Sequence, residues 1–496
     1  MTSTLDIGGM NFAFQNSFHD SMDGFFSPAD AAKPSAPDPL IFNHALAVRL
    51  GIAAEGMTES QLAAIFSGKE TPEGANPLAF AYAGHQFGHF SPQLGDGRAL
   101  LLGEIVAPDG ARFDLQLKGS GPTAFSRNGD GKAAIGPVLR EYLVSEAMAA
   151  MGVPTTRSLA AVATGDRVQR ERSHPGAVLT RAASSHIRVG TFQFFAAHFG
   201  ADHVIQLSEY TINRHFPELA EAANPHLALL DRVFGLQCEL VARWMGVGFI
   251  HGVMNTDNVA VSGETLDYGP CAFMDRFAVN TVFSSIDANG RYAYGRQPQI
   301  THWNMARFAE AMLPAIHAVD PADVDAAKAL VDAIPARFRA QWLDEMREKL
   351  GLGQAKKADE QLIDTLFGEL EQHAVDFTSF FRALAQLLRG DGDLLRALLP
   401  DAEAMAPWIA DWWAQLEREA IAPLERADAM DAVNPLYIPR NHLVEAALVA
   451  AEAGDMAPWT ELLEVVQNPY VERAEWAAFA QPAPIDADPY KTFCGT

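Results

Sequence analysis

Residues 250–270 read IHGVMNTDNVAVSGETLDYGP, and this segment carries the strongest indication of the fold. It contains two short β-like runs among polar loops. Asn258 lies seven residues after His251, and Asp267 lies on the loop that follows. An Asn and an Asp on adjacent loops can share a Mg²⁺ ion, which takes few protein oxygens and completes its shell with phosphate oxygens. Asn258 and Asp267 are therefore candidate metal ligands.

The spacing in this segment resembles the catalytic loop and the metal-binding triplet of protein kinases. Kinases also place the loop Asn seven residues after the His, and the Asp-Tyr-Gly at 267–269 corresponds to their Asp-Phe-Gly. The departure is Val253, because kinases have there the Asp that accepts the proton of the substrate hydroxyl. Asp257 is the nearest substitute, and the alternative is that it only caps a turn.

Upstream, residues 99–118 predict a β-hairpin, since two apolar runs flank the turn sequence Pro-Asp-Gly at 108–110. Period-two alternation places Lys118 on the polar face of the second strand. A helix predicted from Pro137 to Met151 follows, and it carries Glu141. A strand lysine paired with a helix glutamate resembles the kinase layout. Glu146 is the competing partner, and a solvated lysine is the alternative.

Two further groups of residues have the chemistry of a phosphate site. The first is the turn at residues 95–98, where Gly95 and Gly97 bring backbone N–H groups close and Arg98 adds a cation. The second is the pair Arg181 and Arg188, whose planar guanidinium groups can hold a phosphate. The alternatives are an ordinary turn and an ordinary salt-bridged connection.

The order of predicted elements is a β-rich part followed by a helix-rich part. Strands and one helix occupy the chain up to about residue 185, and helices dominate from about residue 190, including His226–Met245 and most of the chain beyond residue 300. We therefore expect an α+β, protein-kinase-like two-lobed fold. Residues 1–185 would form the N-terminal lobe and residues 186–496 an enlarged helical C-terminal lobe.

Composition limits the classes of partner. The 496 residues carry 37 Lys and Arg against 62 Asp and Glu, a formal charge of −25, which disfavours nucleic acid and anionic membranes. No apolar run of about 18 residues predicts a membrane span. The N-terminus has no Lys or Arg before Lys33, unlike a secretory signal or a transit peptide. Three cysteines are too few for a disulfide framework, which agrees with a reducing compartment, so we expect a cytoplasmic protein. We also expect a monomer.

Six long motifs together resemble the selenoprotein O family, whose members are pseudokinase-fold protein adenylyltransferases. The resemblance is to a bacterial, cysteine-containing member. The motifs are AGHQFGHFSPQLGDGRA from Ala83, LQLKGSGPTAFSRNGDGKA, LTRAASSHIRVGTF, IHGVMNTDNVAVSGETLDYGP, NPLYIPRNHLVEAAL and the terminal YKTFCGT.

The resemblance implies an ATP molecule that is inverted relative to kinases. Its γ-phosphate would lie inside the pocket, and its α-phosphorus would face a Ser, Thr or Tyr hydroxyl of a protein substrate, with pyrophosphate leaving. Mg²⁺ or Mn²⁺ would lie at Asn258 and Asp267, and Asp257 would accept the proton. The family's ATP-binding positions are Gly95, Gly97, Arg98, Lys118, Asp130, Gly131, Arg181, Arg188 and Asp267.

The cysteines differ from those of selenocysteine-containing relatives, which have a Cys-x-x-Sec arrangement near the C-terminus. Here Lys491 stands three residues before Cys494, so the local redox pair is absent. Cys271, two residues after the Asp-Tyr-Gly triplet, is a candidate to pair with Cys494 and to link redox state to activity. The alternative is one buried thiol and one free thiol in the tail.

Two rival functions remain open from the sequence. A conventional kinase would use the γ-phosphate, but Val253 replaces its catalytic Asp. An inactive ATP-binding scaffold would not need Lys118, Glu141, Asn258 and Asp267 together. Adenylyl transfer is therefore the function that we expect.

Overall fold

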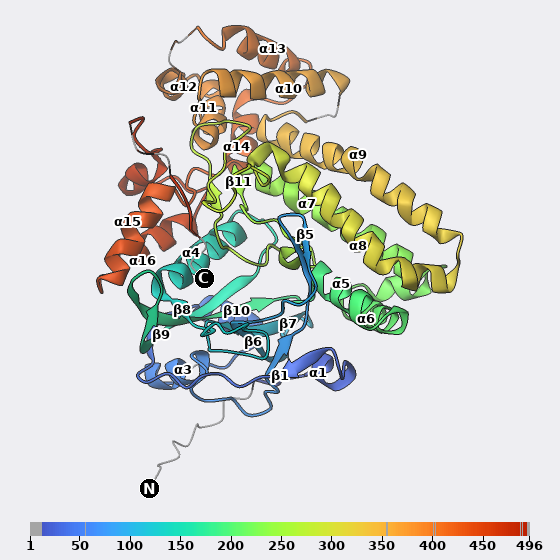
Figure 1. The fold of residues 1–496 in the computed structure, drawn as a ribbon. Coiled ribbons are helices and arrows are strands. Elements are labelled where there is room, and N and C mark those ends of the chain that lie inside the picture. The colour runs from blue at the N-terminus through green and yellow to red at the C-terminus, as the bar shows by residue number, and fades with distance from the viewer. Residues whose placement is uncertain are drawn as a thin grey trace.

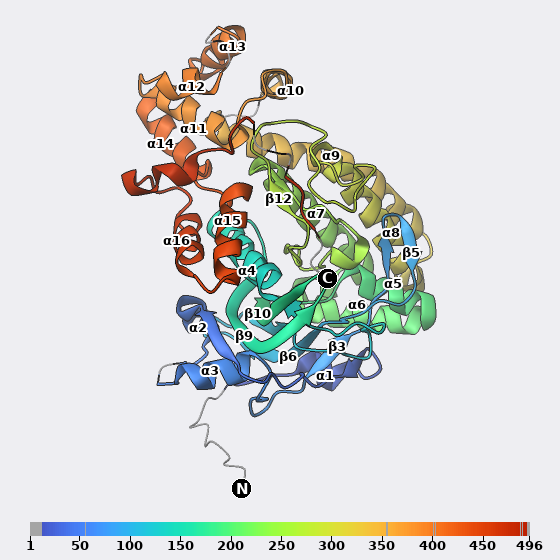
Figure 2. The same ribbon diagram turned by 60° about the vertical axis from the view of Figure 1, so that its left-hand side comes forward.

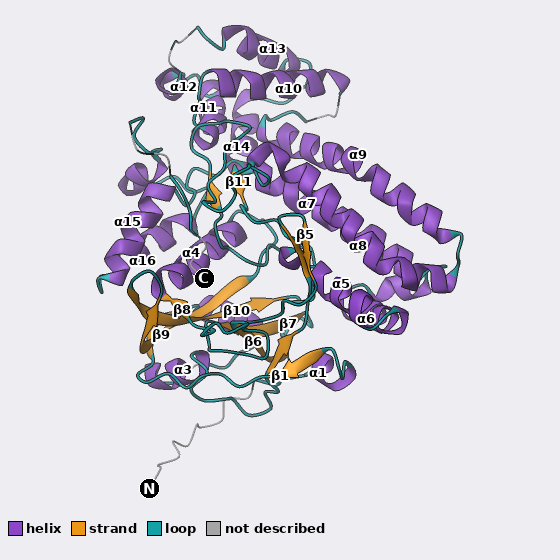
Figure 3. Cartoon of the chain, in the orientation of Figure 1, coloured by secondary structure: helices purple, strands orange, loops and turns teal. Residues whose placement is uncertain are grey.

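The structure is a computed structural model that describes residues 12–493, except 55, 354, 355, 400, 402, 487 and 489. It combines one large sheet, two small two-stranded sheets and many helices (Figure 3). The α+β class expected from the sequence is confirmed.

The large sheet is formed by strands from the first 183 residues and is antiparallel at every pairing. The predicted hairpin at residues 99–118 is present as two neighbouring central strands, β6 and β7. The strand order, with bounds, is β1 (Phe26–Pro28), β3 (Leu78–Phe80), β6 (Ala99–Val106), β7 (Arg112–Lys118), β10 (Ser173–Ala183), β9 (Arg157–Gln169) and β2 (Asp38–Phe42), and β8 (Ala133–Ala134) pairs with β10.

One face of this sheet packs on α2 (His44–Leu50) and α3 (Glu59–Phe66), and α1 (Ser17–Ser21) lies near β1 (Figure 1). Leu115 and Leu117 of β7 join the apolar core on that face. Helices α2 and α3 are separate because α2 ends at Gly51, which has a left-handed φ of 74°.

The other face packs on α4 (Ile135–Ala150), which contacts β9 and β10. The polar residues of β7, Asp114, Gln116 and Lys118, are buried on this face. The alternation of β7 was therefore predicted, whereas its burial on both faces was not, because helices far along the chain cover the polar side.

The helical part follows the sheet and lies above and to the right of it in Figure 1. The predicted helix His226–Met245 lies within α7, which packs against α8 and α9. The first group of helices comprises α5 (Val189–His198), α6 (Ala201–His215), α7 (Pro225–Gly246), α8 (Gln297–Val319) and α9 (Asp323–Lys349).

Of the remaining helices, the first five form a group of their own, and the last two pack on α4. The group at the top of Figure 1 comprises α10 (Lys357–Gln372), α11 (Phe377–Leu388), α12 (Asp393–Leu398), α13 (Ala406–Leu416) and α14 (Pro423–Val433). Figure 2 shows α15 (Asn441–Glu452) and α16 (Ala457–Val466) beside α4, which both helices contact. Within the described residues, no helix combines the length and the apolar character needed to cross a membrane.

Two small hairpins lie near the loop predicted to be functional. β11 (Phe249–Ile250) and β12 (Ala272–Phe273) pair antiparallel and enclose that loop, which includes a 3₁₀ turn at Thr256–Asn258. The second hairpin, β4 (Gly84–Gln86) with β5 (His89–Ser91), has its first strand in contact with this turn. The two hairpins therefore place segments about 170 residues apart in the sequence side by side.

Candidate active site

Three cations surround the carboxylate of Asp267. Lys118 Nζ lies 2.6 Å and Arg181 Nη1 2.8 Å from its Oδ1, and Arg188 Nη1 lies 2.8 Å from its Oδ2. Burial alone would raise the pKa of Asp267, but the three cations hold it well below its usual value. Asp267 is therefore ionised, and a concentrated positive charge lies beside it.

Two strands and one helix hold these cations in place. Lys118 ends β7 and Arg181 lies on the adjacent β10, and both bind Glu141 of α4, at 2.7 and 3.0 Å. The rival partner Glu146 is engaged elsewhere, because it accepts two hydrogen bonds from Arg157 at 2.7 and 2.8 Å. Lys118 is thus paired with the glutamate nearer the start of the helix.

Asp257 lies in the 3₁₀ turn and is 7% exposed. Its Oδ2 accepts a hydrogen bond from Gln86 Nε2 at 3.3 Å, and its buried Oδ1 has no hydrogen-bond partner in the described part of the chain. Burial raises the pKa of Asp257 to about 6. Gly84 of β4 lies so close that a Cβ there would be 2.3 Å from Oδ1. The β4–β5 hairpin therefore packs directly on Oδ1 of Asp257, and this oxygen is buried without a hydrogen-bond partner.

The rest of the loop has distinct roles. Asn258 Nδ2 donates to the backbone oxygen of Val253 at 3.0 Å, which leaves the amide oxygen of Asn258 for another partner. Val253 is a buried apolar residue and offers no proton acceptor. Burial lowers the pKa of His251 to about 4, so this ring is neutral near pH 7. It stacks on Trp244, with ring centroids 5.2 Å apart, and so supports the loop.

The described residues contain no group of three His, Cys, Asp or Glu side chains arranged to hold a metal ion. Asn258 and Asp267 form a smaller, all-oxygen set that includes an amide. This chemistry fits an ion such as Mg²⁺, which keeps much of its shell for phosphate oxygens and water. The metal site remains a prediction.

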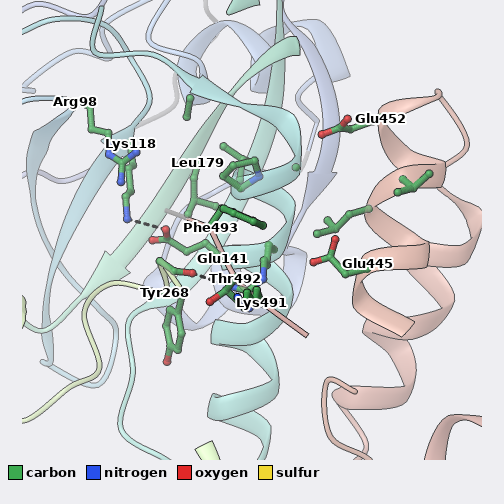
Figure 4. A pocket seen from close by; sticks show the side chains of 18 of the residues that line it. Arg98, Lys118, Glu141, Leu179, Tyr268, Glu445, Glu452, Lys491, Thr492 and Phe493 are labelled. Atoms are coloured by element: carbon green, nitrogen blue, oxygen red, sulfur yellow. Dashed lines mark hydrogen bonds and ion pairs between the residues drawn. The ribbon is translucent and has the colours of Figure 1, made fainter. Parts of the chain in front are cut away.

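A cavity of about 380 Å³, which we call the inner cavity, is lined by the following residues of the site: Lys118, Arg181, Arg188, Val253, Asp257, Asn258 and Asp267. A second cavity of about 320 Å³, the outer cavity, shares Arg98, Lys118 and Gly269 with it. Figure 4 shows the outer cavity, with Arg98 and Lys118 on one side, Glu445 and Glu452 of α15 on the other, and Phe493 between them. A ligand longer than either cavity can therefore extend along Arg98 and Lys118.

The glycines expected at the nucleotide lie against other parts of the chain in this structure. A Cβ at Gly95 would lie 2.4 Å from the ring of Phe125, and one at Gly97 would lie 2.8 Å from the Phe125 backbone oxygen. Gly131 has a φ of 64° and lies against Gly121. The three glycines therefore allow the loop at residues 119–131 to pack on the turn at residues 95–98.

Three of the expected nucleotide residues, Gly95, Asp130 and Gly131, line neither cavity. Asp130 binds Arg170 at 2.9 Å near the surface. This ion pair and the Lys132 backbone N–H lower its pKa. A role for Asp130 at the nucleotide would require contact with a part of the ligand outside both cavities.

Sequence reasoning missed several residues of the inner cavity. Tyr82 lies under Arg188, with the guanidinium carbon 4.7 Å from the ring centroid. Asp96 is buried and accepts hydrogen bonds from the Phe80 backbone at 3.2 Å and from Gln116 at 3.1 Å. Gln86 donates to Asp257. These residues lie within or beside the motif at residues 83–99, but no local pattern indicates their partners.

The structure describes one of the two cysteines that were predicted to pair, Cys271. Cys271 is a buried free thiol whose pKa is raised by burial, and Arg140 Nη1 lies 3.5 Å from its sulfur. The C-terminal segment passes nearby, because Thr492 Oγ1 donates to the backbone oxygen of Pro270 at 2.8 Å. Cys494 lies outside the described residues, so a disulfide with Cys271 remains a prediction.

Comparison with known proteins identifies the family. The family described as protein adenylyltransferase SelO matches residues 9–467. A protein named protein nucleotidyltransferase YdiU from Sphingopyxis alaskensis is 77% identical over 98% of this chain and 100% of its own length. Proteins with the same name from Cereibacter sphaeroides and Chromobacterium violaceum are 54% and 53% identical, over 98% and 95% of this chain and 100% and 99% of their own lengths. The resemblance stated from the motifs is confirmed: the chain belongs to the protein adenylyltransferase SelO family, a family of nucleotidyltransferases.

Proposed function

We propose that this protein transfers AMP from ATP to Ser, Thr or Tyr hydroxyls of protein substrates, with release of pyrophosphate. The proposal places the site between the lobes of a protein-kinase-like fold, residues 1–185 and 186–496. The observation that carries it is the inner cavity itself. Three cations converge on Asp267, one of them, Arg188, also donates to the backbone oxygen of Asp257 at 2.7 Å, and Val253 occupies the position of the kinase base.

The distribution of charge supports an inverted nucleotide. Lys118, Arg181 and Arg188 have side chains only 10%, 2% and 4% exposed. A buried triphosphate end requires this much positive charge, because an unpaired anion in a protein interior is strongly destabilised. With the γ-phosphate at these cations, the adenosine extends past Gly97 and Arg98 toward the outer cavity. Gly95, Asp130 and Gly131 line neither cavity and would contact only a part of the nucleotide that extends beyond both.

The same arrangement suggests how the cations change partners. In this structure Lys118, Arg181 and Arg188 all bind Asp267. Phosphate oxygens would compete for these donors through charge-assisted hydrogen bonds. Asp267 would then be available, with Asn258, to hold Mg²⁺ or Mn²⁺, whose charge would polarise the phosphate oxygens.

In the reaction, the hydroxyl oxygen of the acceptor attacks the α-phosphorus of ATP, and the bond between the α-phosphorus and the bridging oxygen breaks. The carboxylate of Asp257 accepts the hydroxyl proton. The electron pair leaves with pyrophosphate, whose charge is stabilised by Lys118, Arg181 and Arg188. Positioning and electrostatic stabilisation supply most of the rate.

A labelling experiment tests the proposal. The protein is incubated with an acceptor protein and either α-³²P-ATP or γ-³²P-ATP, alongside Asp267→Ala and a matched control, Asp364→Ala, which removes a surface aspartate paired with Arg339. We expect label only from the α position, lost in Asp267→Ala and retained in the control. Label only from the γ position would mean a kinase. ATP binding without either label would mean a scaffold.

A further inference from the structure

A third cavity, of about 460 Å³, lies beside the catalytic loop and has no role in the mechanism above. We call it the arginine cavity. Phe87 and Ile286 line both this cavity and the inner cavity, so the two lie next to each other. A ligand segment in the arginine cavity can therefore extend past Phe87 and Ile286 toward the inner cavity that Asp257 lines.

The wall of the arginine cavity is fixed to the catalytic loop. Phe87, at the turn of the β4–β5 hairpin, donates its backbone N–H to Asn255 Oδ1 at 3.1 Å, and the Tyr292 hydroxyl donates to the same oxygen at 2.6 Å. Asn255 lies two residues before Asp257. A group bound in this cavity is therefore held in a defined position relative to the proposed proton acceptor.

The cavity carries positive charge that the protein does not neutralise. Arg291 and Arg296 line it, and neither has a carboxylate within 4.0 Å among the described residues. Asp287 is the acid in its lining, but it is 5% exposed, and its two oxygens accept the backbone N–H groups of Arg291 and Tyr292 at 2.8 Å each. Arg296 Nη1 makes one long hydrogen bond, of 3.5 Å, to the backbone oxygen of Asn289, so each guanidinium keeps donors that can bind an anion.

The guanidinium of Arg291 is also held in orientation. Its central carbon lies 4.9 Å from the ring centroid of Trp303 on α8, and its buried Nε has no hydrogen-bond partner in the described part of the chain. A planar guanidinium fixed on an aromatic ring is suited to binding a carboxylate through two parallel hydrogen bonds. The chain has a net charge of −25, so most of its surface repels acidic peptides, and a local pair of arginines would attract them.

We propose that the arginine cavity binds the acceptor protein and selects acceptor segments that carry an Asp or Glu within a few residues of the modified hydroxyl. This inference rests on the proposed function, since it assigns the substrate class of the same site. The acidic side chain binds Arg291 and Arg296, the neighbouring residue contacts Phe87 and Ile286, and the hydroxyl reaches the inner cavity beside Asp257.

The test measures peptide binding without catalysis. Three fluorescent peptides share one hydroxyl residue and differ only in a neighbouring Glu, Gln or Lys, and their affinities are measured by fluorescence anisotropy. We expect the Glu peptide to bind about tenfold more tightly than the Gln peptide, as one good charge-assisted contact provides. The preference should disappear in Arg291→Ala and reverse in Arg296→Glu.

Controls keep the result interpretable. Arg296 is exposed, so its substitution tests the site even where Arg291→Ala disturbs packing around Trp303. Arg339→Ala is the matched control, because Arg339 also stacks on a tryptophan, at 4.9 Å from the Trp342 ring, but lies on α9 and pairs with Asp364. Equal affinity for the three peptides, or a preference unchanged in both Arg291→Ala and Arg296→Glu, would overturn the inference.

The same peptides separate this inference from the proposed function. Arginine-dependent binding of the Glu peptide, without label from α-³²P-ATP, would leave the acidic site standing and reject adenylyl transfer. Transfer of AMP to all three peptides at equal rates in wild type and Arg296→Glu would support adenylyl transfer and reject the acidic site.

Discussion

Strand β7 carries two buried ionic clusters on the same face, and they differ in what surrounds them. Asp114, near the start of the strand, belongs to one, and Lys118, at its end, belongs to the other. Between them, Gln116 accepts a hydrogen bond from Arg181 at 2.8 Å. One strand face thus leads from a closed ionic cluster to an open one.

The Asp114 cluster is closed. Arg214 of α6 lies between Asp114 and Glu104, at 2.6 and 2.8 Å, and these three side chains are at most 3% exposed. Burial alone would raise the pKa of Asp114, but Arg214 and His186 hold it at about 2. The charges satisfy one another, and the cluster fastens the sheet to α6.

The Asp267 cluster has similar chemistry but borders a cavity. Asp267 is 18% exposed and, with the three cations that bind it, lines the inner cavity of about 380 Å³. Perturbed ionisation occurs in both clusters, so it does not by itself identify a functional site. Open space beside the charges, together with the unpartnered oxygen of Asp257, distinguishes the candidate active site.

The largest effect is expected at the open cluster. Lys118→Met removes a cation from the proposed phosphate site and should lower kcat/KM for AMP transfer by about 10³-fold. Initial rates with α-³²P-ATP measure this loss. Lys328→Met, at an exposed position of α9, is the matched control and should keep its rate. If Lys118→Met kept more than a tenth of the wild-type kcat/KM, the open cluster would have no special role in the reaction compared with the closed one.

The closed cluster should respond in stability. Arg214→Met leaves Asp114 and Glu104 buried without their shared cation and should lower the free energy of unfolding by about 3–5 kcal/mol. Urea denaturation measures this loss, with Arg396→Met, in a surface ion pair with Asp393, as the control. A variant that stays equally stable but loses AMP transfer would show that Arg214 belongs to the reaction after all.

A smaller effect on rate is expected at the proton acceptor. Asp257→Asn keeps the shape of the side chain but cannot take the hydroxyl proton, so kcat should fall by about 10²-fold. The dissociation constant for ATP, measured by isothermal titration, should change little, because the phosphate-binding cations are retained. A large rise in that constant with unchanged kcat would instead place Asp257 in nucleotide binding.

The smallest effect is expected in the pH dependence of stability, at the carboxylate of Glu264. Glu264 accepts hydrogen bonds from Ser184, at 3.0 Å, and from Ser262, at 2.9 Å, and burial raises its pKa to about 7. Protonated Glu264 stabilises the folded state, and this contribution is lost as pH rises from the unfolded pKa of about 4.5 through about 7.

Glu264→Gln should therefore match wild type in melting temperature near pH 4 and exceed it by about 1–3 °C above pH 8. Differential scanning fluorimetry across this pH range measures the difference. Ser262→Ala provides a control that keeps the carboxylate. A difference between wild type and Glu264→Gln that stays constant with pH would show that the side chain does not titrate in this range.

The sequence predicted those parts of the site that depend on local pattern. The hairpin at residues 99–118, the helix that carries Glu141 and the seven-residue spacing from His251 to Asn258 are all short-range features. The long motifs also identified the family, which the match over residues 9–467 confirms. Turn residues, periodicity and fixed spacing act within about 25 residues, so they can be read without a structure.

Only the tertiary structure decided which of these features meet. Alternation along β7 predicted a polar face, but the structure shows that α4 and the helical part bury it. Three features join distant segments: the approach of Gly84 to Asp257, the pairing of Asp130 with Arg170, and the position of the arginine cavity next to the inner cavity. A sequence specifies which side of an element is polar, whereas the charge partners and open space on that side depend on how the whole chain packs.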